Sequence, residues 1–447
     1  MSCIRKFANR AKPWVIKQKL IPVGQVILPG DKSIAHRALI LSALAQGKTC
    51  LKNFPLHDDA LSTLNALTAL GVKITRHKDQ VKVWGRGLNK LKKPSQPIFV
   101  GNSGTTLRLL LGVLAGENFK TKIIAGKYLS KRPMLRVNLP LRLMGAKIAA
   151  KIIDKEEYAP IVISGGHLKG IIYVMPVASA QVKSAILLAG LSACAKTQVI
   201  ECLKSRDHTE RMLKIFGANI IVKNKTLTLN PNRNLVSPGD IYIPGDISSA
   251  AFFMVLALII PGSKIIMQRV SLNPTRSGII NVLKRMQARI IVSQNNKSKN
   301  FEPMGNLLVK SSPLKGVAIS SSQIPALIDE LPIIMVAACF AKGSTVIKGV
   351  GELRVKETDR IISMVKNLKS MGADIAVKKI NTQECIVIRG GKQLKGASFK
   401  SFSDHRTAMS MIVAGLAARG ESRVDDISCI NKSFPGFLTV LKSLDKR

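Results

Sequence analysis

Residues 29–33 read Pro-Gly-Asp-Lys-Ser, and residues 244–248 repeat this pattern as Pro-Gly-Asp-Ile-Ser. Each copy is followed by an apolar stretch of helical length and then by a small-residue turn into a β-like run. Stretches of this kind recur about every 70 to 80 residues, which is typical of an internal structural repeat. They begin near Ser33, Gly104, Ser179, Ser248, Asp329 and Asp404. The sequence therefore predicts six copies of one structural unit.

Each unit is predicted to contain two kinds of helix. The six apolar stretches are hydrophobic on nearly all sides, which predicts helices buried inside a domain. A more amphipathic element follows most of them and ends in a similar pattern, as in LGVKI from Leu70 and MGADI from Met371. A glycine at this point predicts a left-handed cap between a helix and a strand. Gln287 takes its place in one copy.

The matched motifs divide the six units into two groups of three. We therefore expect an α+β protein of two similar domains with the buried helices at their centres, since 447 residues are too many for one continuous core. The first domain is predicted to span residues 30–244. The second is predicted to span residues 245–447 together with residues 1–29, which would provide a strand that crosses back to it.

The balance of charged residues bears on the class of ligand. The chain has 69 Lys and Arg against 26 Asp and Glu, a net charge of +43, which raises the alternative of a nucleic-acid-binding protein. However, the cations are spread along the whole chain, aromatic residues make up only 4%, and no basic stripe is interleaved with stacking rings. We therefore expect no nucleic-acid partner. A positive field suits a phosphorylated small molecule equally well.

Hydropathy and cysteine usage predict the compartment. The longest apolar stretch, 250–260, is shorter than the roughly 18 residues of a membrane span, so no membrane association is expected. The seven cysteines form no C-x-x-C pair, which predicts reduced, buried thiols in a cytoplasmic protein without a zinc site. The first twenty residues are basic but lack the apolar core of a secretory signal. They are interpreted as an ordinary N-terminal strand or a short organelle-targeting segment.

Polar residues gather at the starts of the predicted buried helices, where unpaired backbone N–H groups and the helix dipole attract anions. Cations that were merely solvated would have no reason to recur at equivalent places in several repeats. The cations at or near these starts are Lys32, Arg37, Arg108, Arg132, His405 and Arg406. Gly104 would allow a phosphate or carboxylate to approach the backbone closely. The pattern predicts an anion-binding site formed by several repeats.

Two carboxylates are candidates for acid–base chemistry. Asp329 stands at the head of an otherwise apolar helix, where it is either an N-cap or a catalytic group. Glu357 is expected on one helical turn with Lys356 and Arg360. It is either a surface ion-pair residue or a carboxylate that these cations keep ionised beside a bound anion.

Eight collinear segments are together characteristic of one family. They are LPGDKSIAHRALIL from Leu28, GNSGTTLRLL from Gly101, SKRPM from Ser130, SAQVKSAILLAGL from Ser179, SRDHTERM from Ser205, PGDISSAAFF from Pro244, ELRVKETDR from Glu352 and DHRTAM from Asp404. In this order they resemble the 5-enolpyruvylshikimate-3-phosphate synthase family, from about residue 20 onward. The resemblance implies two similar domains, each of three β-α-β-α-β-β units arranged as an inside-out α/β barrel.

The resemblance also implies an enzyme that transfers the enolpyruvyl group of phosphoenolpyruvate to the 5-hydroxyl of shikimate 3-phosphate, on the pathway to chorismate and the aromatic amino acids. Phosphoenolpyruvate would be held by Lys32, Gly104, Arg132, Gln181, Arg360, Arg406 and Lys432. Shikimate 3-phosphate would be held by Lys32, Ser33, Arg37, Ser179, Ala180, Gln181, Arg206, Asp329 and Lys356. In the catalytic set, Asp329 would deprotonate the 5-hydroxyl, while Glu357 and Lys32 would transfer the proton at the methylene carbon. No metal or organic cofactor is implied, and the enzyme would be a cytoplasmic monomer.

Some features of the chain depart from this resemblance and leave alternatives open. Residues 126–130, GKYLS, replace a family segment that usually reads Gly-Asp-x-Ser-Leu and look one residue shorter, which affects the placement of Arg132. This departure and the high charge leave open a decayed enzyme that keeps only the fold. The sister family that uses UDP-N-acetylglucosamine carries a cysteine in its reactive loop, and residues 116–132 contain none. Gly104, with Ala180 nearby, implies sensitivity or intermediate sensitivity to glyphosate.

Overall fold

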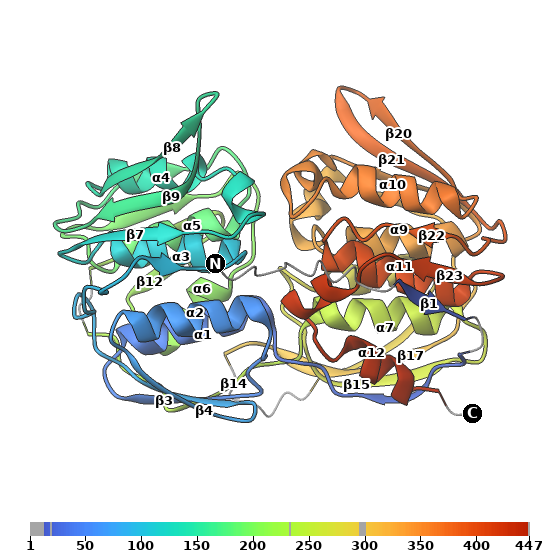
Figure 1. Cartoon of the computed structure of the whole chain (residues 1–447), viewed down its shortest axis with the longest axis horizontal. Helices are drawn as coiled ribbons and strands as arrows, with labels where there is room; N and C mark the ends of the chain where they lie inside the picture. The colour runs from blue at the N-terminus through green and yellow to red at the C-terminus, as the bar shows by residue number, and fades with distance from the viewer. Residues whose placement is uncertain (1–12, 18–19, 232–233, 295–300, 446–447) are drawn as a thin grey trace, which may run out of the picture.

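The structure, a computed structural model, describes residues 13–17, 20–231, 234–294 and 301–445. The chain forms two halves that lie side by side (Figure 1). Both halves combine helices with small sheets, which confirms the predicted α+β class with two similar parts. Residues 1–12, to which most of the predicted targeting segment and Cys3 belong, lie outside the described residues. Within those residues, no helix has both the length and the apolar character needed to cross a membrane.

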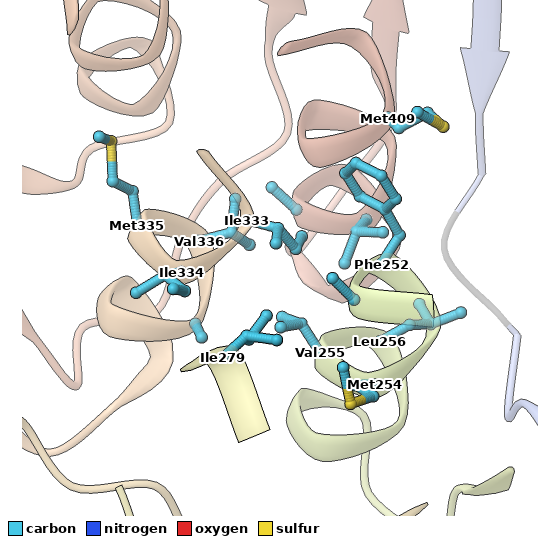
Figure 2. Packing of buried hydrophobic residues seen from close by; sticks show 14 of the residues in the cluster. Phe252, Met254, Val255, Leu256, Ile279, Ile333, Ile334, Met335, Val336 and Met409 are labelled. Atoms are coloured by element: carbon cyan, nitrogen blue, oxygen red, sulfur yellow. The ribbon is translucent and has the colours of Figure 1, made fainter. Parts of the chain in front are cut away.

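The centre of each half is formed by buried helices that begin close to the predicted positions. They are α1 (Lys32–Leu44), α3 (Gly104–Leu114) and α5 (Ala180–Gly190) in the first half, and α7 (Ile247–Ile259), α9 (Leu331–Phe340) and α11 (His405–Ala417) in the second. Nearly all of their residues are buried, as a helix that is apolar on all sides requires. Figure 2 shows Val255 of α7 and Ile333 of α9 facing one another in the second half, with Ile279 beside them.

The second kind of helix is shorter or more amphipathic and follows each central helix. These helices are α2 (Asp58–Ala69), α4 (Leu135–Leu143), α6 (His208–Ile215), α8 (Gly278–Arg285), α10 (Arg360–Ser370) and α12 (Phe437–Ser443). Short 3-10 helices lie in the connections between these elements. They are η1 (Leu129–Lys131), η2 (Ser321–Ala326), η3 (Gly351–Val355) and η4 (Ser428–Lys432).

The three sheets of the first half share one strand order. They are β14 (Asp240–Tyr242), β3 (Lys48–Lys52), β5 (Gln80–Trp84), β4 (Lys73–His77); then β6 (Ile98–Phe99), β7 (Lys120–Ile124), β9 (Glu156–Ser164), β8 (Lys147–Ile153); then β10 (Ile172–Val174), β11 (Thr197–Ile200), β13 (Thr226–Leu229), β12 (Ile220–Lys223). In each sheet the first two strands are parallel and the others antiparallel. The outer strand of the first sheet, β14, comes from the far end of this half.

Two sheets of the second half repeat this scheme, whereas the third has three strands, and two of the three sheets take a strand from the N-terminal segment. Its sheets are β2 (Val23–Val26), β15 (Lys264–Ser271), β17 (Met304–Lys310), β16 (Arg289–Gln294); then β18 (Ala318–Ile319), β19 (Gly343–Lys348), β21 (Gln383–Gly390), β20 (Asp374–Ile380); then β1 (Trp14–Ile16), β23 (Ser422–Val424), β22 (Ser398–Phe399). Figure 1 shows β1, in dark blue, beside β23 in red. This pairing, and that of β2 with β15, supports the predicted crossing of an N-terminal strand to the second half.

The hydrophobic core is divided in the same way. One cluster of buried apolar side chains runs from Ile34 to Ile243, and the other joins Ile16–Leu28 to Ile247–Leu444. This division supports the proposed domain limits of 30–244 and of 1–29 with 245–447.

The two matched motifs form the crossover between the halves. The Asp31 N–H donates to the Pro244 carbonyl at 2.8 Å, and the Asp246 N–H donates to the Pro29 carbonyl at 3.0 Å. The Asp31 carboxylate accepts a hydrogen bond from the Ile34 N–H at 3.0 Å, and Asp246 caps α7 similarly. A Cβ at Gly30 would lie 2.1 Å from the Asn53 carbonyl oxygen, so only glycine fits this crossing. The repeated motif therefore reflects two chain segments that meet.

The amphipathic helices end in left-handed residues, as predicted. Gly71, Gly145, Gly217 and Gly372 have φ between +82° and +112°, and Gln287 adopts φ +68° at the equivalent place. The backbone conformation is thus the same in all five copies, although the Cβ of Gln287 makes the left-handed conformation higher in free energy there than at a glycine.

Replacement of Gln287 by Gly is expected to raise the free energy of unfolding by about 0.5–1 kcal/mol, because glycine relieves the left-handed strain. The midpoint of urea unfolding measures the change. The control is the opposite change, Gly372→Ala. Gly372 has φ +85°, and a Cβ added there would meet no atom within 4 Å. It should lose stability through backbone strain alone. A stabilising effect of Gly372→Ala would contradict this account of the caps.

The cysteine prediction is only partly correct. Cys339, Cys385 and Cys429 are buried, but Cys194 and Cys202 are exposed, because they lie in turns beyond the central helix and strand. The described cysteines are free thiols, as predicted.

Candidate active site

A cavity of about 470 Å³ lies between the two halves, within the size range of small-molecule sites. Twelve of the predicted site residues line it: Lys32, Ser33, Gly104, Arg132, Ser179, Ala180, Gln181, Arg206, Asp329, Lys356, Glu357 and Arg406. Most belong to the starts of α1, α3, α5 and α11 or to the segments just before α9 and α10. The structure therefore brings together residues that are separated by up to several hundred positions in the sequence.

Capping residues fix the N-termini of the helices that carry these side chains. The Ser103 hydroxyl accepts a hydrogen bond from the Thr106 N–H at 3.2 Å at the start of α3, and the Ser179 hydroxyl accepts one from the Val182 N–H at 3.4 Å at the start of α5. The positive ends of these helix dipoles consequently face the same cavity and favour anions there.

Asp329 is surrounded by arginines. Its carboxylate is paired with Arg206 of the first half, with Arg360 at 3.3 Å and with Arg406 at 3.4 Å. Burial alone would raise the pKa of Asp329, but Arg406, Arg206 and the other cations hold this pKa well below its ordinary value. The N-cap position of α9 is occupied by Glu330, so Asp329 is one residue outside the helix. Its carboxylate is therefore free to face the cavity and does not serve as the cap.

Glu357 lies next to the same arginine. Its carboxylate accepts a hydrogen bond from Arg360 Nη2 at 2.5 Å and lies 3.5 Å from Arg132 Nη1. Burial would raise the pKa of Glu357, but Arg360 and Arg132 hold it well below its ordinary value. The expected placement on a helical turn was wrong, because η3 ends at Val355 and α10 begins only at Arg360. Asp359 caps α10, so the residues before it form a bend that directs Glu357 into the cavity.

The remaining polar wall is preorganised by hydrogen bonds. Gln181 accepts a bond from Arg108 Nη1 at 2.8 Å and donates one to the Thr105 hydroxyl at 2.9 Å. Lys32 Nζ is 2.9 Å from Asp59 Oδ2. Burial lowers the pKa of Lys356 to about 8. Residues 126–130, which depart from the family pattern, nevertheless leave Arg132 on the cavity wall.

Three predicted residues do not line this cavity. Arg37 is buried and donates to Thr209, to Ser184 and to the Ser33 carbonyl, so it supports Ser33 from behind. Arg360 is 1% exposed and lies behind the two carboxylates. Lys432 borders a small adjoining pocket that Arg132 and Glu357 also line.

Sequence reasoning missed Arg276, which lines the cavity and pairs with Glu330 at 2.7 Å. It lies between β15 and α8, away from the predicted helix starts. The only available signal was indirect, because the buried acids of the matched motifs require a cation. The ion pair between Arg136 and Glu352 at 3.1 Å, which joins the halves at the cavity wall, was also not predicted.

Comparisons with known proteins identify the family of this chain. A family model described as EPSP synthase (3-phosphoshikimate 1-carboxyvinyltransferase) matches residues 18–441. The chain belongs to the EPSP synthase family. It is 47% identical over 422 residues to the 3-phosphoshikimate 1-carboxyvinyltransferase of Desulforamulus reducens, covering 94% of this chain and 96% of that relative. The relative of the same name from Geotalea daltonii is 46% identical over 421 residues, covering 94% and 96%.

The family assignment extends to the three-dimensional fold. The EPSP synthase of Acinetobacter baumannii, solved at 2.37 Å, superimposes with a TM-score of 0.85 at 40% sequence identity, covering 96% of this chain and 97% of that one. The resemblance found from the eight segments is thereby confirmed, as is the two-part fold that it implied.

Proposed function

We propose that this EPSP synthase family member transfers the enolpyruvyl group of phosphoenolpyruvate to the 5-hydroxyl of shikimate 3-phosphate and releases phosphate. The observation that carries the proposal is a pair of carboxylates, Asp329 and Glu357, that share Arg360 and face one cation-lined cavity. Two anionic substrates require many cations, and their reaction requires two acid–base groups.

The reaction assigns a task to each group. The 5-hydroxyl oxygen adds to the substituted carbon of the enolpyruvyl group, Asp329 accepts the hydroxyl proton, and Lys32 supplies a proton to the methylene carbon. The carbon–oxygen bond to phosphate then breaks, the leaving phosphate takes the proton from Asp329, and the ionised Glu357 takes a proton from the methyl carbon to restore the double bond. Transfer of this proton from Glu357 to Lys32 returns both groups to their starting states. The arginines stabilise the leaving phosphate. The chain's own side chains supply every proton transfer, so the proposal requires no metal or organic cofactor.

The proposal takes most contacts to shikimate 3-phosphate from the first half and the contacts to phosphoenolpyruvate from both halves. Ser33, Arg37, Ser179, Ala180, Gln181, Arg206 and Lys356 hold shikimate 3-phosphate, with Arg37 acting through Ser33. Gly104, Arg132, Arg360, Arg406 and Lys432 hold phosphoenolpyruvate, and Lys32 and Gln181 contact both substrates. The protein acts as a cytoplasmic monomer without a nucleic-acid or membrane partner. Light scattering should accordingly give a mass near 48.4 kDa.

Phosphate release by the purified protein tests the reaction. We expect release when phosphoenolpyruvate is combined with shikimate 3-phosphate, and none when UDP-N-acetylglucosamine replaces this acceptor. Release with the nucleotide sugar alone would assign the chain to the sister reaction, and folded protein that releases no phosphate with either acceptor would be a decayed enzyme.

Replacement of Gly104 by Ala is expected to raise the KM for phosphoenolpyruvate about tenfold or more, because an added methyl group crowds the donor pocket. The new Cβ would lie 2.8 Å from Arg108 Nη1 and 3.0 Å from Arg132 Nη1, so both guanidinium groups must move. Initial rates at varied donor concentration measure this change, and the KM for shikimate 3-phosphate serves as the internal control. An equal rise of both constants would indicate a general disturbance of the site.

A further inference from the structure

Arg206 is followed by Asp207 and His208, whose side chains contact the second half. Asn273 Nδ2 donates to Asp207 Oδ1 at 2.6 Å, and the Thr275 hydroxyl lies 3.2 Å from the same oxygen. The Asp207 N–H donates back to the Thr275 hydroxyl at 3.2 Å. The backbone next to Arg206 is therefore held by side chains of the opposite half.

A second, fully buried contact extends this junction. His208 Nδ1 lies 2.6 Å from Glu302 Oε1, and Asn273 Nδ2 donates to Glu302 Oε2 at 2.8 Å. His208, Asn273 and Glu302 are each 0% exposed. Breaking such a buried polar network leaves groups without partners, which makes its geometry strongly preferred.

Both segments of this junction continue into the cavity. On one side, Arg206 reaches Asp329. On the other side, Arg276 follows Thr275 and pairs with Glu330, the neighbour of Asp329. The position of the junction therefore sets the distance between the guanidinium of Arg206 and the carboxylate of Asp329.

We infer that Asp207, His208, Asn273, Thr275 and Glu302, here called the interdomain cluster, are positioning residues that hold Arg206 opposite Asp329. None of the five lines the cavity, so they act only through their neighbours. The inference rests on the proposed function, because it gives Arg206 its role in binding shikimate 3-phosphate.

The pair of variants Thr275→Val and Thr275→Ser tests this inference. Valine keeps the shape of this partly buried side chain but removes the hydroxyl, whereas serine keeps the hydroxyl and loses only a methyl group. Thr275→Val is expected to lower kcat/KM for shikimate 3-phosphate about tenfold through a higher KM, with a smaller change in the KM for phosphoenolpyruvate. Thr275→Ser should restore most of the loss. Thr228→Val, which removes a hydroxyl bonded to Gln198 in a sheet outside the cavity, is the matched control and should match the wild type.

A double-mutant cycle separates positioning from general stability. If the cluster acts through Arg206, adding Thr275→Val to Arg206→Ala should lower kcat/KM no further than Arg206→Ala alone. Losses that multiply in the double variant would overturn the inference. So would equal losses in Thr275→Val, Thr275→Ser and Thr228→Val.

Amide hydrogen exchange gives a readout that does not depend on catalysis. The Asp207 amide should exchange faster in Thr275→Val than in Thr275→Ser, because its acceptor is lost. The two variants could differ in exchange while the wild-type protein releases no phosphate. That result would remove the proposed function, and with it the role of Arg206, and would leave the interdomain cluster as a structural junction. Unchanged exchange together with unchanged kcat/KM would overturn the inference itself.

Discussion

Replacement of Asp329 by Asn is expected to lower kcat for phosphate release by about 10²–10⁴-fold, the usual contribution of a positioned acid–base group. Asparagine has nearly the same shape, so it fills the same space and keeps one oxygen that accepts from the arginines, but it cannot accept the hydroxyl proton. Steady-state phosphate release at saturating concentrations of both substrates measures the effect. A loss that appears only in KM would instead assign Asp329 to binding.

The matched control is Asp240→Asn. Asp240 is also paired with a cation, Lys52, but it is exposed and does not line the cavity, so its variant should keep wild-type kcat. A similar loss in both variants would show that the change at Asp329 acts through folding and would contradict its catalytic role.

The arginines around Asp329 also predict a pH dependence. The pKa of Asp329 in the folded protein lies well below its ordinary value of 3.8. The stability from its ion pairs is therefore fully present above pH 3.8 and is lost only as pH falls through the lower, folded-state pKa. The free enzyme should therefore show no acidic limb from Asp329 in kcat/KM above about pH 4. Anionic substrates compete for Arg206 and Arg406 and thereby raise the pKa of Asp329. The acidic limb of kcat should consequently lie at higher pH than that of kcat/KM.

The central helices were predictable because their signals are local. A cap residue followed by a largely apolar run marks α1 and α7, and a glycine marks the end of α2. The strand order was not predictable, since strands such as Ile98–Phe99 are too short to show periodicity. The outer strand β14 joins β3 almost two hundred residues away, which no local pattern encodes.

The site was predictable to a similar degree. Residues at helix starts, such as Lys32 and Gly104, follow from the repeat and the anion preference of helix N-termini. The arginines around Asp329 come from positions 206, 360 and 406, and only the fold brings them together. Even the resemblance could not indicate that Arg37 supports Ser33 from behind the cavity wall.

Replacement of Arg276 by Met is expected to lower the free energy of unfolding by about 3–5 kcal/mol, because it leaves buried carboxylates without their cation. The Arg276 side chain is 2% exposed and lies 2.7 Å from Glu330, 3.4 Å from Asp246 and 4.0 Å from Asp31. The last two are the aspartates of the matched motifs, so one cation serves both crossing segments. Urea unfolding followed by circular dichroism measures the loss.

The pH dependence of this loss identifies its cause. Burial and the neighbouring Asp246 raise the pKa of Asp31 even though Arg276 opposes them, so removal of Arg276 should raise it further. A carboxyl group with a raised folded-state pKa destabilises the protein above that pKa, and protonation relieves the cost as pH falls. The deficit of Arg276→Met should therefore shrink as pH falls from neutrality. Arg354→Met, which breaks exposed pairs with Glu384 and Asp359, should cost less than about 1 kcal/mol. A deficit at Arg276 that is independent of pH would mean that lost packing, rather than unpaired charge, destabilises the crossover.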